Sequence, residues 1–236
     1  RVLTDQIAHY NFAPTPTAVK NLQKSECNPK SIHLTGNPIV EVTQRQMEHA
    51  RNALVKEWGL EKNEYALVTF HRSENVDVPK RLHAFVKTLQ GLSRTVIFPL
   101  HPRTRNRLKE AGLLEKLEKA THVRLVEPQG YREMLALGAN ARFLLSDSGG
   151  LQEEASIFKK PILVARDNTE RPEIIGTFGM LVGVDPEKIR LGVEWIERDY
   201  EGWCRKLEKT STPFGDGKAS ARILEILERE QNVNRF

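Results

Sequence analysis

The stretch that decides the fold is RFLLSDSGGLQEEA, residues 142–155. It passes without a linker from a continuous apolar run, Arg142–Ser146, into a helix-like segment at 150–159. Two glycines stand at the junction. A continuous apolar run bounded by turn residues is typical of a strand that is covered on both faces of its sheet. The sequence therefore predicts a buried strand, a tight turn and a helix, as in a βαβ unit.

The same alternation recurs on both sides of this stretch. Five further apolar runs predict strands, namely Tyr65–Phe70, Thr95–Leu100, Val123–Val126, Ile162–Ala165 and Met180–Val184. Amphipathic stretches predict helices between them, at 78–92, 103–118, 131–139 and 186–199. This order indicates an α/β fold with a Rossmann-like, doubly wound parallel sheet.

The two ends of the chain show a different pattern. Near the N-terminus, a loop leads into a helix at Pro16, and SIHLTGNP (31–38) predicts a short strand with a turn. Val40–Trp58 predicts one long amphipathic helix. Near the C-terminus, the loop TPFGDG (212–217) precedes a last helix at Ala219–Glu230.

The composition is that of an ordinary globular protein. The 236 residues include 36 Lys and Arg against 31 Asp and Glu, a net charge of +5. Charges of both signs alternate along the chain, whereas nucleic-acid binders usually gather Lys and Arg on one element, so we expect no nucleic-acid partner. No apolar run approaches the roughly 20 residues of a spanning helix, and the first residues lack the apolar stretch of a secretory signal. We therefore expect a cytoplasmic protein with no membrane partner.

The two cysteines, Cys27 and Cys204, lie far apart in the sequence. Neither belongs to a CxxC pair or stands near a cluster of His residues, which are the usual signs of a zinc site. We therefore expect two free thiols and no metal site.

Polar residues follow five consecutive predicted strands. The five loops begin HRSEN (71–75), HPR (101–103), EPQGY (127–131), DSGG (147–150) and RDNTER (166–171). In open parallel sheets, ligands bind beyond the carboxyl ends of the strands. Any one of these loops could simply cap a helix, but the five together favour a binding site at this edge.

Ser148, Gly149 and Gly150 form the most specific motif. Two glycines allow the backbone to approach a ligand closely, and the first N–H groups of the following helix favour a phosphate. No GK[ST] follows, so the motif is not a Walker loop, and it is not GxGxxG either. Alternatively, the glycines only make a tight turn and Ser148 caps the helix. Glu154, one turn into the helix, could accept from both hydroxyls of a ribose or could simply interact with the helix N-terminus.

Two further residues fit a phosphate ligand. Arg171, in the loop RDNTERPE (166–173), could form a bidentate pair with phosphate oxygens, although a solvated charged loop explains it equally well. His71 could donate to a phosphate oxygen or assist a leaving group because its pKa lies near neutrality. A structural histidine is an equal alternative.

Several motifs occur in order along almost the whole chain. They are LTDQIAHYNFAPT (3–15), LTGNP (34–38), TFHRSEN (69–75), FPLHPRT (98–104), EPQGY (127–131), LLSDSGGLQEEA (144–155) and RDNTERPE (166–173), with GTFGMLVG (176–183) after it. Together they resemble the UDP-N-acetylglucosamine 2-epimerases of the non-hydrolysing bacterial and archaeal type. The resemblance implies a GT-B-like fold of two Rossmann-like domains, of which this chain would form the C-terminal half.

The resemblance also implies a domain division. Residues 1–36 would be the tail of an N-terminal Rossmann-like domain with a linker. Residues 37–217 would form the C-terminal UDP-binding domain. Residues 218–236 would be a helix that returns toward the N-terminal domain.

The resemblance further implies which residues bind UDP. These are Gln129, Met134, Ser148, Gly149, Gly150, Glu154 and Arg171. Residues 148–150 and Arg171 would hold the diphosphate, Glu154 the ribose, and Gln129 and Met134 the uracil. Many family members have a larger apolar or aromatic residue at the position of Met134.

His71 is the family catalytic position found in this chain, and it would also contact the phosphates. Arg72 would lie near a second, regulatory site for UDP-N-acetylglucosamine (UDP-GlcNAc). The implied reaction is the reversible inversion of UDP-GlcNAc at C2 to UDP-N-acetylmannosamine (UDP-ManNAc), by elimination and re-addition of UDP and without a cofactor. A homodimer and a role in cell-surface polysaccharide biosynthesis are expected of the full-length protein.

This chain departs from the family at its start. Family members begin with roughly 130 further residues, about one additional domain. That domain would supply one Asp and two Glu that move the C2 proton, so this chain would contribute the UDP-binding part. Two alternatives remain open: a hydrolysing relative that releases free N-acetylmannosamine, and a non-catalytic module that binds UDP-sugars and whose gene starts near Arg1.

Overall fold

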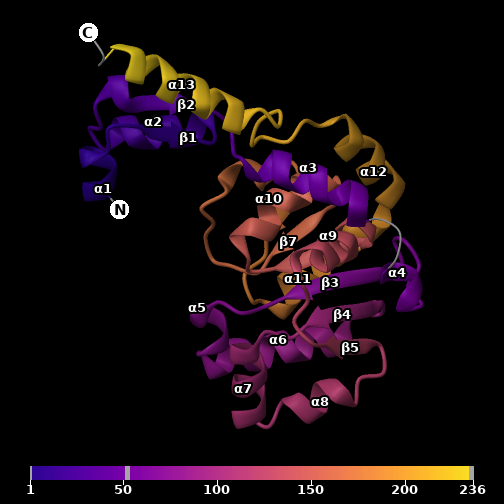
Figure 1. Ribbon diagram of the computed structural model, residues 1–236. Coiled ribbons are helices and arrows are strands. Elements are labelled where there is room, and N and C mark those ends of the chain that lie inside the picture. Colours follow the sequence, from indigo (N-terminus) through magenta and orange to yellow (C-terminus); the bar gives the residue numbers. More distant parts are fainter. Residues whose placement is uncertain (1, 51–53, 234–236) are drawn as a thin grey trace. The chain divides into compact units, whose positions relative to one another are not determined.

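The computed structural model describes residues 2–50 and 54–233 (Figure 1). The chain divides into two compact units, a terminal unit (residues 1–45 and 212–236) and a sheet unit (residues 46–211). The division after residue 45 falls within helix α3 (Ile39–Ala50). The boundaries expected from the sequence, after residues 36 and 217, both fall inside the terminal unit. Within the described residues, no helix combines the length and the apolar character needed to span a membrane.

The sheet unit contains six strands, all parallel. They are β3 (Tyr65–Thr69), β4 (Thr95–Pro99), β5 (Val123–Val126), β6 (Phe143–Ser146), β7 (Ile162–Val164) and β8 (Gly179–Leu181). Their spatial order is β5-β4-β3-β6-β7-β8, so the winding of the sheet reverses between β3 and β6. This is the strand order of a Rossmann-type doubly wound sheet. The structure thus confirms the predicted α/β class and all six predicted strands.

Helices connect these strands (Figure 1). They are α4 (Leu54–Glu57), α5 (Ser73–Val76), α6 (Pro79–Gly91), α7 (Pro102–Glu110), α8 (Leu114–Glu118), α9 (Tyr131–Asn140), α10 (Gly149–Phe158), α11 (Pro186–Arg198) and α12 (Tyr200–Lys209), with a short 3-10 helix at Pro172–Ile174.

Successive residues of β3 face opposite sides of the sheet. Ala66 and Val68 belong to the main core, together with buried side chains of α6 and α11 such as Phe85 and Ile189. On the other side, the hydroxyl of Tyr65 donates to a backbone carbonyl of α9 at 2.7 Å. Both faces of the sheet are therefore covered, which explains why the strands read as continuous apolar runs.

Three helix predictions differ from the structure. The segment 103–118 forms two helices, because Gly112 between them adopts a left-handed backbone (φ +64°) that ends α7. The helix expected at 186–199 is followed at once by α12, which the sequence did not predict, and Asp199 caps its start by accepting from Gly202 N at 2.9 Å. In the expected helix 40–58, α3 ends at residue 50 and α4 begins at residue 54, and residues 51–53 lie outside the described residues.

The terminal unit joins both ends of the chain. It contains α1 (Val2–Ile7), β1 (Asn11–Ala13), α2 (Pro16–Lys24), a 3-10 helix at Pro29–Ser31, β2 (Ile32–Leu34), the first residues of α3, and α13 (Ala219–Val233). Strands β1 and β2 pair in parallel.

Contacts within the terminal unit hold the C-terminal segment. Asn37 N donates to the carbonyl of Phe214 at 2.8 Å. Arg222 forms a two-point ion pair with Asp216 and donates to the carbonyl of Thr35 at 3.1 Å. Residues 212–222 therefore pack on the loop before α3.

Candidate functional site

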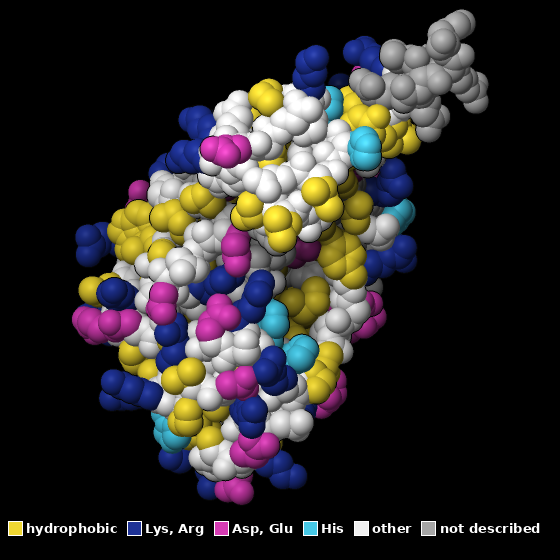
Figure 2. All heavy atoms as spheres, turned by 90° about the vertical axis from the view of Figure 1, so that its left-hand side faces the viewer, with side chains coloured by type: hydrophobic (Ala, Val, Ile, Leu, Met, Phe, Trp, Pro, Cys, Tyr) yellow, Lys and Arg dark blue, Asp and Glu magenta, His cyan; other side chains and the backbone are white. Residues whose placement is uncertain are grey.

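The polar loops meet where the winding of the sheet reverses. Strands β3 and β6 are neighbours, and at their ends the hydroxyls of Thr69 and Ser146 lie 2.6 Å apart. His71 leaves β3 at this point and Asp147 leaves β6. The carboxyl edge at such a reversal is where ligands bind in this class of sheet. Figure 2 shows basic, acidic and histidine side chains intermixed on the face that includes this edge.

Helix α10 begins at this edge with the SGG motif. Ser148 is the N-cap residue, and its hydroxyl accepts from Leu151 N at 3.4 Å. The capping interpretation of Ser148 is therefore confirmed. One cap satisfies one donor, whereas a helix start presents several unpaired N–H groups, so capping leaves room for an anion at Gly149 and Gly150.

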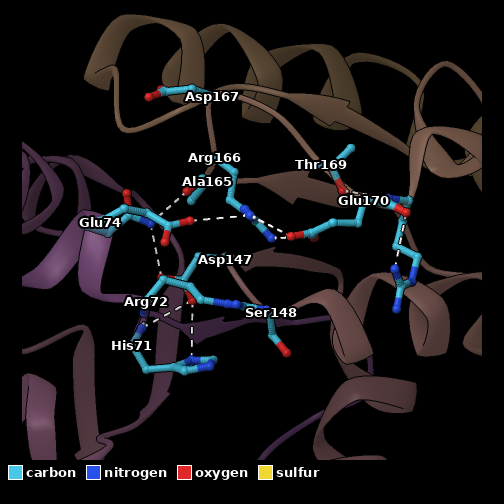
Figure 3. Close-up of polar contacts among 12 residues, drawn as sticks. His71, Arg72, Glu74, Asp147, Ser148, Ala165, Arg166, Asp167, Thr169 and Glu170 are labelled. Atoms are coloured by element: carbon cyan, nitrogen blue, oxygen red, sulfur yellow. Dashed lines mark hydrogen bonds and ion pairs between the residues drawn. The ribbon is translucent and has the colours of Figure 1, made fainter. Parts of the chain in front are cut away.

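The side chain of Arg72 lies at the start of α10. A Cβ added at Gly149 would stand 3.8 Å from Nη2 of Arg72. Nε of Arg72 is buried and has no hydrogen-bond partner among the described residues. Figure 3 shows this side chain extending from the end of β3 toward Ser148. A guanidinium and a helix N-terminus thus act on the same small region, and both favour a phosphate.

The loop 166–173 is fixed in place rather than freely solvated. The guanidinium of Arg166 is buried, forms two hydrogen bonds with Glu170 at 2.7 and 3.0 Å, and lies 3.3 Å from Glu74 (Figure 3). The hydroxyl of Thr169 donates to Gln152 of α10 at 2.5 Å. These contacts hold the loop against the first turns of α10.

Arg171 is oriented by the same helix. Its Nε donates to Oε1 of the buried Glu153, and its Nη1 donates to the carbonyl of Glu170 at 3.1 Å. The side chain stays one-third exposed. The structure thus brings Arg171 to α10, as the sequence interpretation requires, with a guanidinium edge still open to solvent.

Glu154 connects α10 to the start of α9. Burial raises the pKa of Glu154 to about 7, an effect that nearby Glu153 increases and a hydrogen bond from Tyr131 opposes. Tyr131 is the first residue of α9. A carboxyl group that is half protonated at neutral pH can both donate and accept hydrogen bonds, which suits a pair of hydroxyls.

Helix α9 also positions the two residues expected near the uracil. Gln129 lies just before the helix, where its Nε2 donates to the carbonyl of Glu127 at 2.7 Å. Met134 lies one turn into α9 and is partly buried. The tyrosine that bonds Glu154 therefore belongs to the same segment as these two residues.

His71 is partly buried at the end of β3. Burial lowers the pKa of His71, the neighbouring His101 and Arg72 lower it further, and the carboxylate of Asp147 opposes them. The rings of His71 and His101 lie 5.6 Å apart between their centres. In the absence of ligand, His71 is therefore mainly neutral at pH 7.

The sequence interpretation missed Asp147 and Asn75. Asp147 is completely buried and binds the start of the HRSEN loop, and Asn75 donates to it at 3.1 Å. The position of Asp147 directly after a buried strand does indicate a buried carboxylate, and a buried carboxylate needs hydrogen-bond donors. The sequence could not show which residues these are. Within residues 2–50 and 54–233, no group of three or more His, Cys, Asp or Glu is arranged to hold a metal ion.

Comparison with known proteins gives a consistent result. Residues 1–228 match the family model described as UDP-N-acetylglucosamine 2-epimerase. A UDP-N-acetylglucosamine 2-epimerase of Methanococcus maripaludis is 40% identical to this chain over an alignment of 236 positions. The alignment covers 96% of this chain and 63% of that protein.

Solved structures of UDP-GlcNAc 2-epimerases resemble this chain in fold. The UDP-GlcNAc 2-epimerase of Methanocaldococcus jannaschii, crystallised with UDP-GlcNAc and UDP, superposes with a TM-score of 0.84 at 39% identity, over 97% of this chain and 63% of that one. The enzyme of Neisseria meningitidis bound to UDP-GlcNAc gives a TM-score of 0.82 at 29% identity, over 97% and 64%. The sheet unit thus has the fold of GT-B-like relatives. The chain spans somewhat under two thirds of the length of the relatives that it matches.

Proposed function

Because the chain belongs to the UDP-N-acetylglucosamine 2-epimerase family, we propose that it is the UDP-binding part of an enzyme that inverts UDP-GlcNAc at C2 to UDP-ManNAc. The observation that supports this most strongly is the start of α10. There, an SGG helix N-terminus, the Arg72 guanidinium and the loop of Arg171 come together at the reversal of the sheet. This arrangement suits a diphosphate better than a neutral ligand.

Each part of the nucleotide has a proposed set of partners. The diphosphate is bound by Ser148, Gly149 and Gly150, with Arg171 and His71 beside it. The ribose hydroxyls bind Glu154, whose carboxyl group bonds Tyr131 at the start of α9. The uracil lies along α9, against Gln129 and Met134.

The chemistry follows from where charge develops. Elimination of UDP breaks the bond from C1 to the diphosphate oxygen and leaves an additional negative charge on that oxygen. Donors that are already oriented at the helix start stabilise this charge in the transition state without reorganising. Removal of the C2 proton needs a positioned base. We propose that this base lies outside the 236 residues.

Further properties of the whole protein are part of this proposal. They are a homodimeric state, a cytoplasmic location, a role in cell-surface polysaccharide biosynthesis, and a regulatory UDP-GlcNAc site near Arg72. We also propose that residues 1–36 and the last helix, 218–236, associate with an N-terminal Rossmann-like domain, and that residues 37–217 form the UDP-binding domain. The hydrogen bond from Arg222 to the carbonyl of Thr35 joins the last helix to residues 1–36 and supports treating the two segments together.

The test is product analysis on the protein that includes the coding sequence upstream of residue 1. UDP-GlcNAc is supplied, and the sugar C2 signals are followed by NMR in deuterated water. We expect UDP-ManNAc, with deuterium at C2. Release of free N-acetylmannosamine with UDP would favour the hydrolysing alternative. Binding of UDP-GlcNAc without any deuterium exchange would favour the non-catalytic module.

A further inference from the structure

Asp147 is a buried carboxylate that accepts hydrogen bonds from N–H donors of the loop after β3. Its oxygens accept from the backbone N–H of His71 at 3.0 and 3.1 Å, from the backbone N–H of Arg72 at 2.8 Å, and from Nδ2 of Asn75 at 3.1 Å. The side chain has no exposed surface. The residue directly after β6 thus fixes the backbone path of the loop that follows β3.

The orientation of Asn75 is itself determined. Its Oδ1 accepts from Nε of Arg81 at 3.1 Å, so its Nδ2 is the group that faces Asp147 and the carbonyl of Ala165. Arg81 is held in turn by two hydrogen bonds to Asp167, at 2.7 and 3.0 Å. The donors around Asp147 therefore form a fixed frame that extends to the loop after β7.

The same carboxylate faces the ring of His71. Nδ1 of His71 lies 3.3 Å from Oδ1 of Asp147 (Figure 3). A carboxylate can only accept, so this contact favours the imidazole form that has its proton on Nδ1. Because Asp147 accepts from the backbone N–H of His71 and also stands 3.3 Å from Nδ1 of its ring, it acts on the position of the ring and on its tautomer together. The unprotonated nitrogen of the neutral ring is then Nε2.

Charges around the ring make it responsive to an anion. The carboxylate of Asp147 raises the pKa of His71, whereas His101 and Arg72 lower it. His101, Arg72 and burial thus disfavour a positive charge on the imidazole ring of His71. A phosphate at the start of α10 would favour that charge. The side chain of His71 is 34% exposed, so a proton can reach it from solvent.

We propose that Asp147 is a positioning residue that holds His71 in the Nδ1–H tautomer, so that Nε2 takes up a proton from solvent when a nucleoside diphosphate binds. The resulting imidazolium donates Nε2–H to a phosphate oxygen and keeps Nδ1–H on Asp147. No bond other than the N–H bond forms, and the proton comes from water. This inference rests on the proposed function, because the anion is the diphosphate of that site.

The test is ¹⁵N NMR of the histidine rings in the 236-residue chain, with the His71 signals assigned by their loss in His71→Gln. In the protein without nucleotide, we expect the neutral ring of His71 to be protonated on Nδ1. On addition of UDP-GlcNAc, whose diphosphate does not itself titrate near pH 7, we expect the pKa of His71 to rise. A neutral ring protonated on Nε2 would overturn the proposal, and so would nucleotide binding that leaves the pKa of His71 unchanged.

Two variants test the part of Asp147. Asp147→Asn removes the charge, and we expect the pKa of His71 to fall by about 1 unit. Asp77→Asn is the matched control, because Asp77 bonds Arg103 and Arg107 on the surface, and it should leave His71 unchanged. An unchanged pKa in Asp147→Asn would contradict the role of Asp147. If that variant does not fold, the tautomer of the wild-type ring still decides the question.

These outcomes separate the inference from the function on which it rests. If UDP-GlcNAc perturbs no resonance of the chain, the proposed nucleotide site is wrong, whatever the tautomer of His71. If nucleotide binds and the ring is protonated on Nε2, the site stands and only the role of Asp147 is wrong.

Discussion

The guanidinium of Arg72 lies beside Gly149, with Nη2 only 3.8 Å from where a Cβ of that glycine would stand. The start of α10 is thus next to a cation whose Nε has no hydrogen-bond partner in the described part of the chain. A diphosphate bound at the helix start would lie close to the positive charge of this guanidinium. We expect Arg72→Ala to weaken UDP binding by about tenfold to a hundredfold, the effect of losing a charged hydrogen bond. Calorimetry with UDP measures this.

The control for this prediction is Arg107→Ala. Arg107 is an exposed arginine of α7, and it pairs with Glu110 on the same helix and with Asp77 at the end of α5. It should leave the affinity for UDP unchanged. Equal losses in the two variants would mean that net charge, and not the position of Arg72, determines binding.

Arg171 bonds Glu153 of α10 and also presents a guanidinium group to the proposed phosphate site. Its Nε is bonded to Glu153 and its Nη1 to the carbonyl of Glu170, which leaves Nη2 to face a ligand. Lysine keeps the positive charge but lacks the planar fork that directs separate donors toward Glu153 and toward a phosphate. We expect Arg171→Lys to weaken UDP binding about tenfold. The exposed Arg190→Lys on α11 is the matched control, and an equal affinity of Arg171→Lys and wild type would contradict the assignment.

The raised pKa of Glu154 makes the stability of the fold depend on pH. Because burial raises this pKa to about 7, the folded state is penalised when the carboxyl group ionises. The penalty is absent well below the pKa of the unfolded chain, grows as pH rises toward 7, and is complete above it. Glu154→Gln removes the penalty. We expect this variant to gain up to about 3 kcal/mol at pH 8 and less than about 1 kcal/mol at pH 5.

Urea unfolding at the two pH values measures the gain of Glu154→Gln. Glu110→Gln, at an exposed carboxylate, corrects for the general effect of removing a charge. A gain that is the same at pH 5 and pH 8 would show that ionisation of Glu154 is not its cause.

Gly179 allows β7 and β8 to approach closely. A Cβ at this position would lie 2.4 Å from the backbone oxygen of Ile162, which cannot move without breaking the pairing of the two strands. We expect Gly179→Ala to lower the free energy of unfolding by about 1–3 kcal/mol. Gly91→Ala is the control, because no atom lies within 4 Å of its added Cβ, and alanine should be neutral or stabilising at the end of α6. Urea unfolding that shows equal stabilities would contradict the packing argument.

Sequence patterns could predict the framework because the strands are buried on both faces. Continuous apolar runs such as Tyr65–Phe70 need no tertiary information to be recognised, and a polar residue after such a run must lie at the carboxyl edge. This is why the placement of His71 and Ser148 at one edge could be expected. The break between α7 and α8 depends on one residue, Gly112, whose left-handed conformation an amphipathic pattern does not reveal.

The contacts that orient the site could not be predicted in the same way. Asp147 and His71 are 76 residues apart in the chain, and Glu153 and Arg171 are 18 residues apart. Which carboxylate pairs with which donor depends on the register of β3 and β6 and on the path of the loop after β7. Neither is encoded in local composition. The structure therefore adds the contacts of Asp147 and Glu153, whereas the residues proposed to bind the ligand could be predicted from their motifs.

The central claim is that a diphosphate binds at the start of α10, and titration of UDP into Gly149→Asp tests it most directly. Gly149 has no left-handed backbone, and an added Cβ would stand 3.8 Å from the nearest neighbouring atom, so the backbone accepts a Cβ there without strain. The neutral Gly149→Asn is the matched control. We expect calorimetry to show UDP binding by the wild-type chain, a loss of at least about a hundredfold in Gly149→Asp, and a smaller loss in Gly149→Asn. An affinity of Gly149→Asp equal to that of wild type would contradict the site.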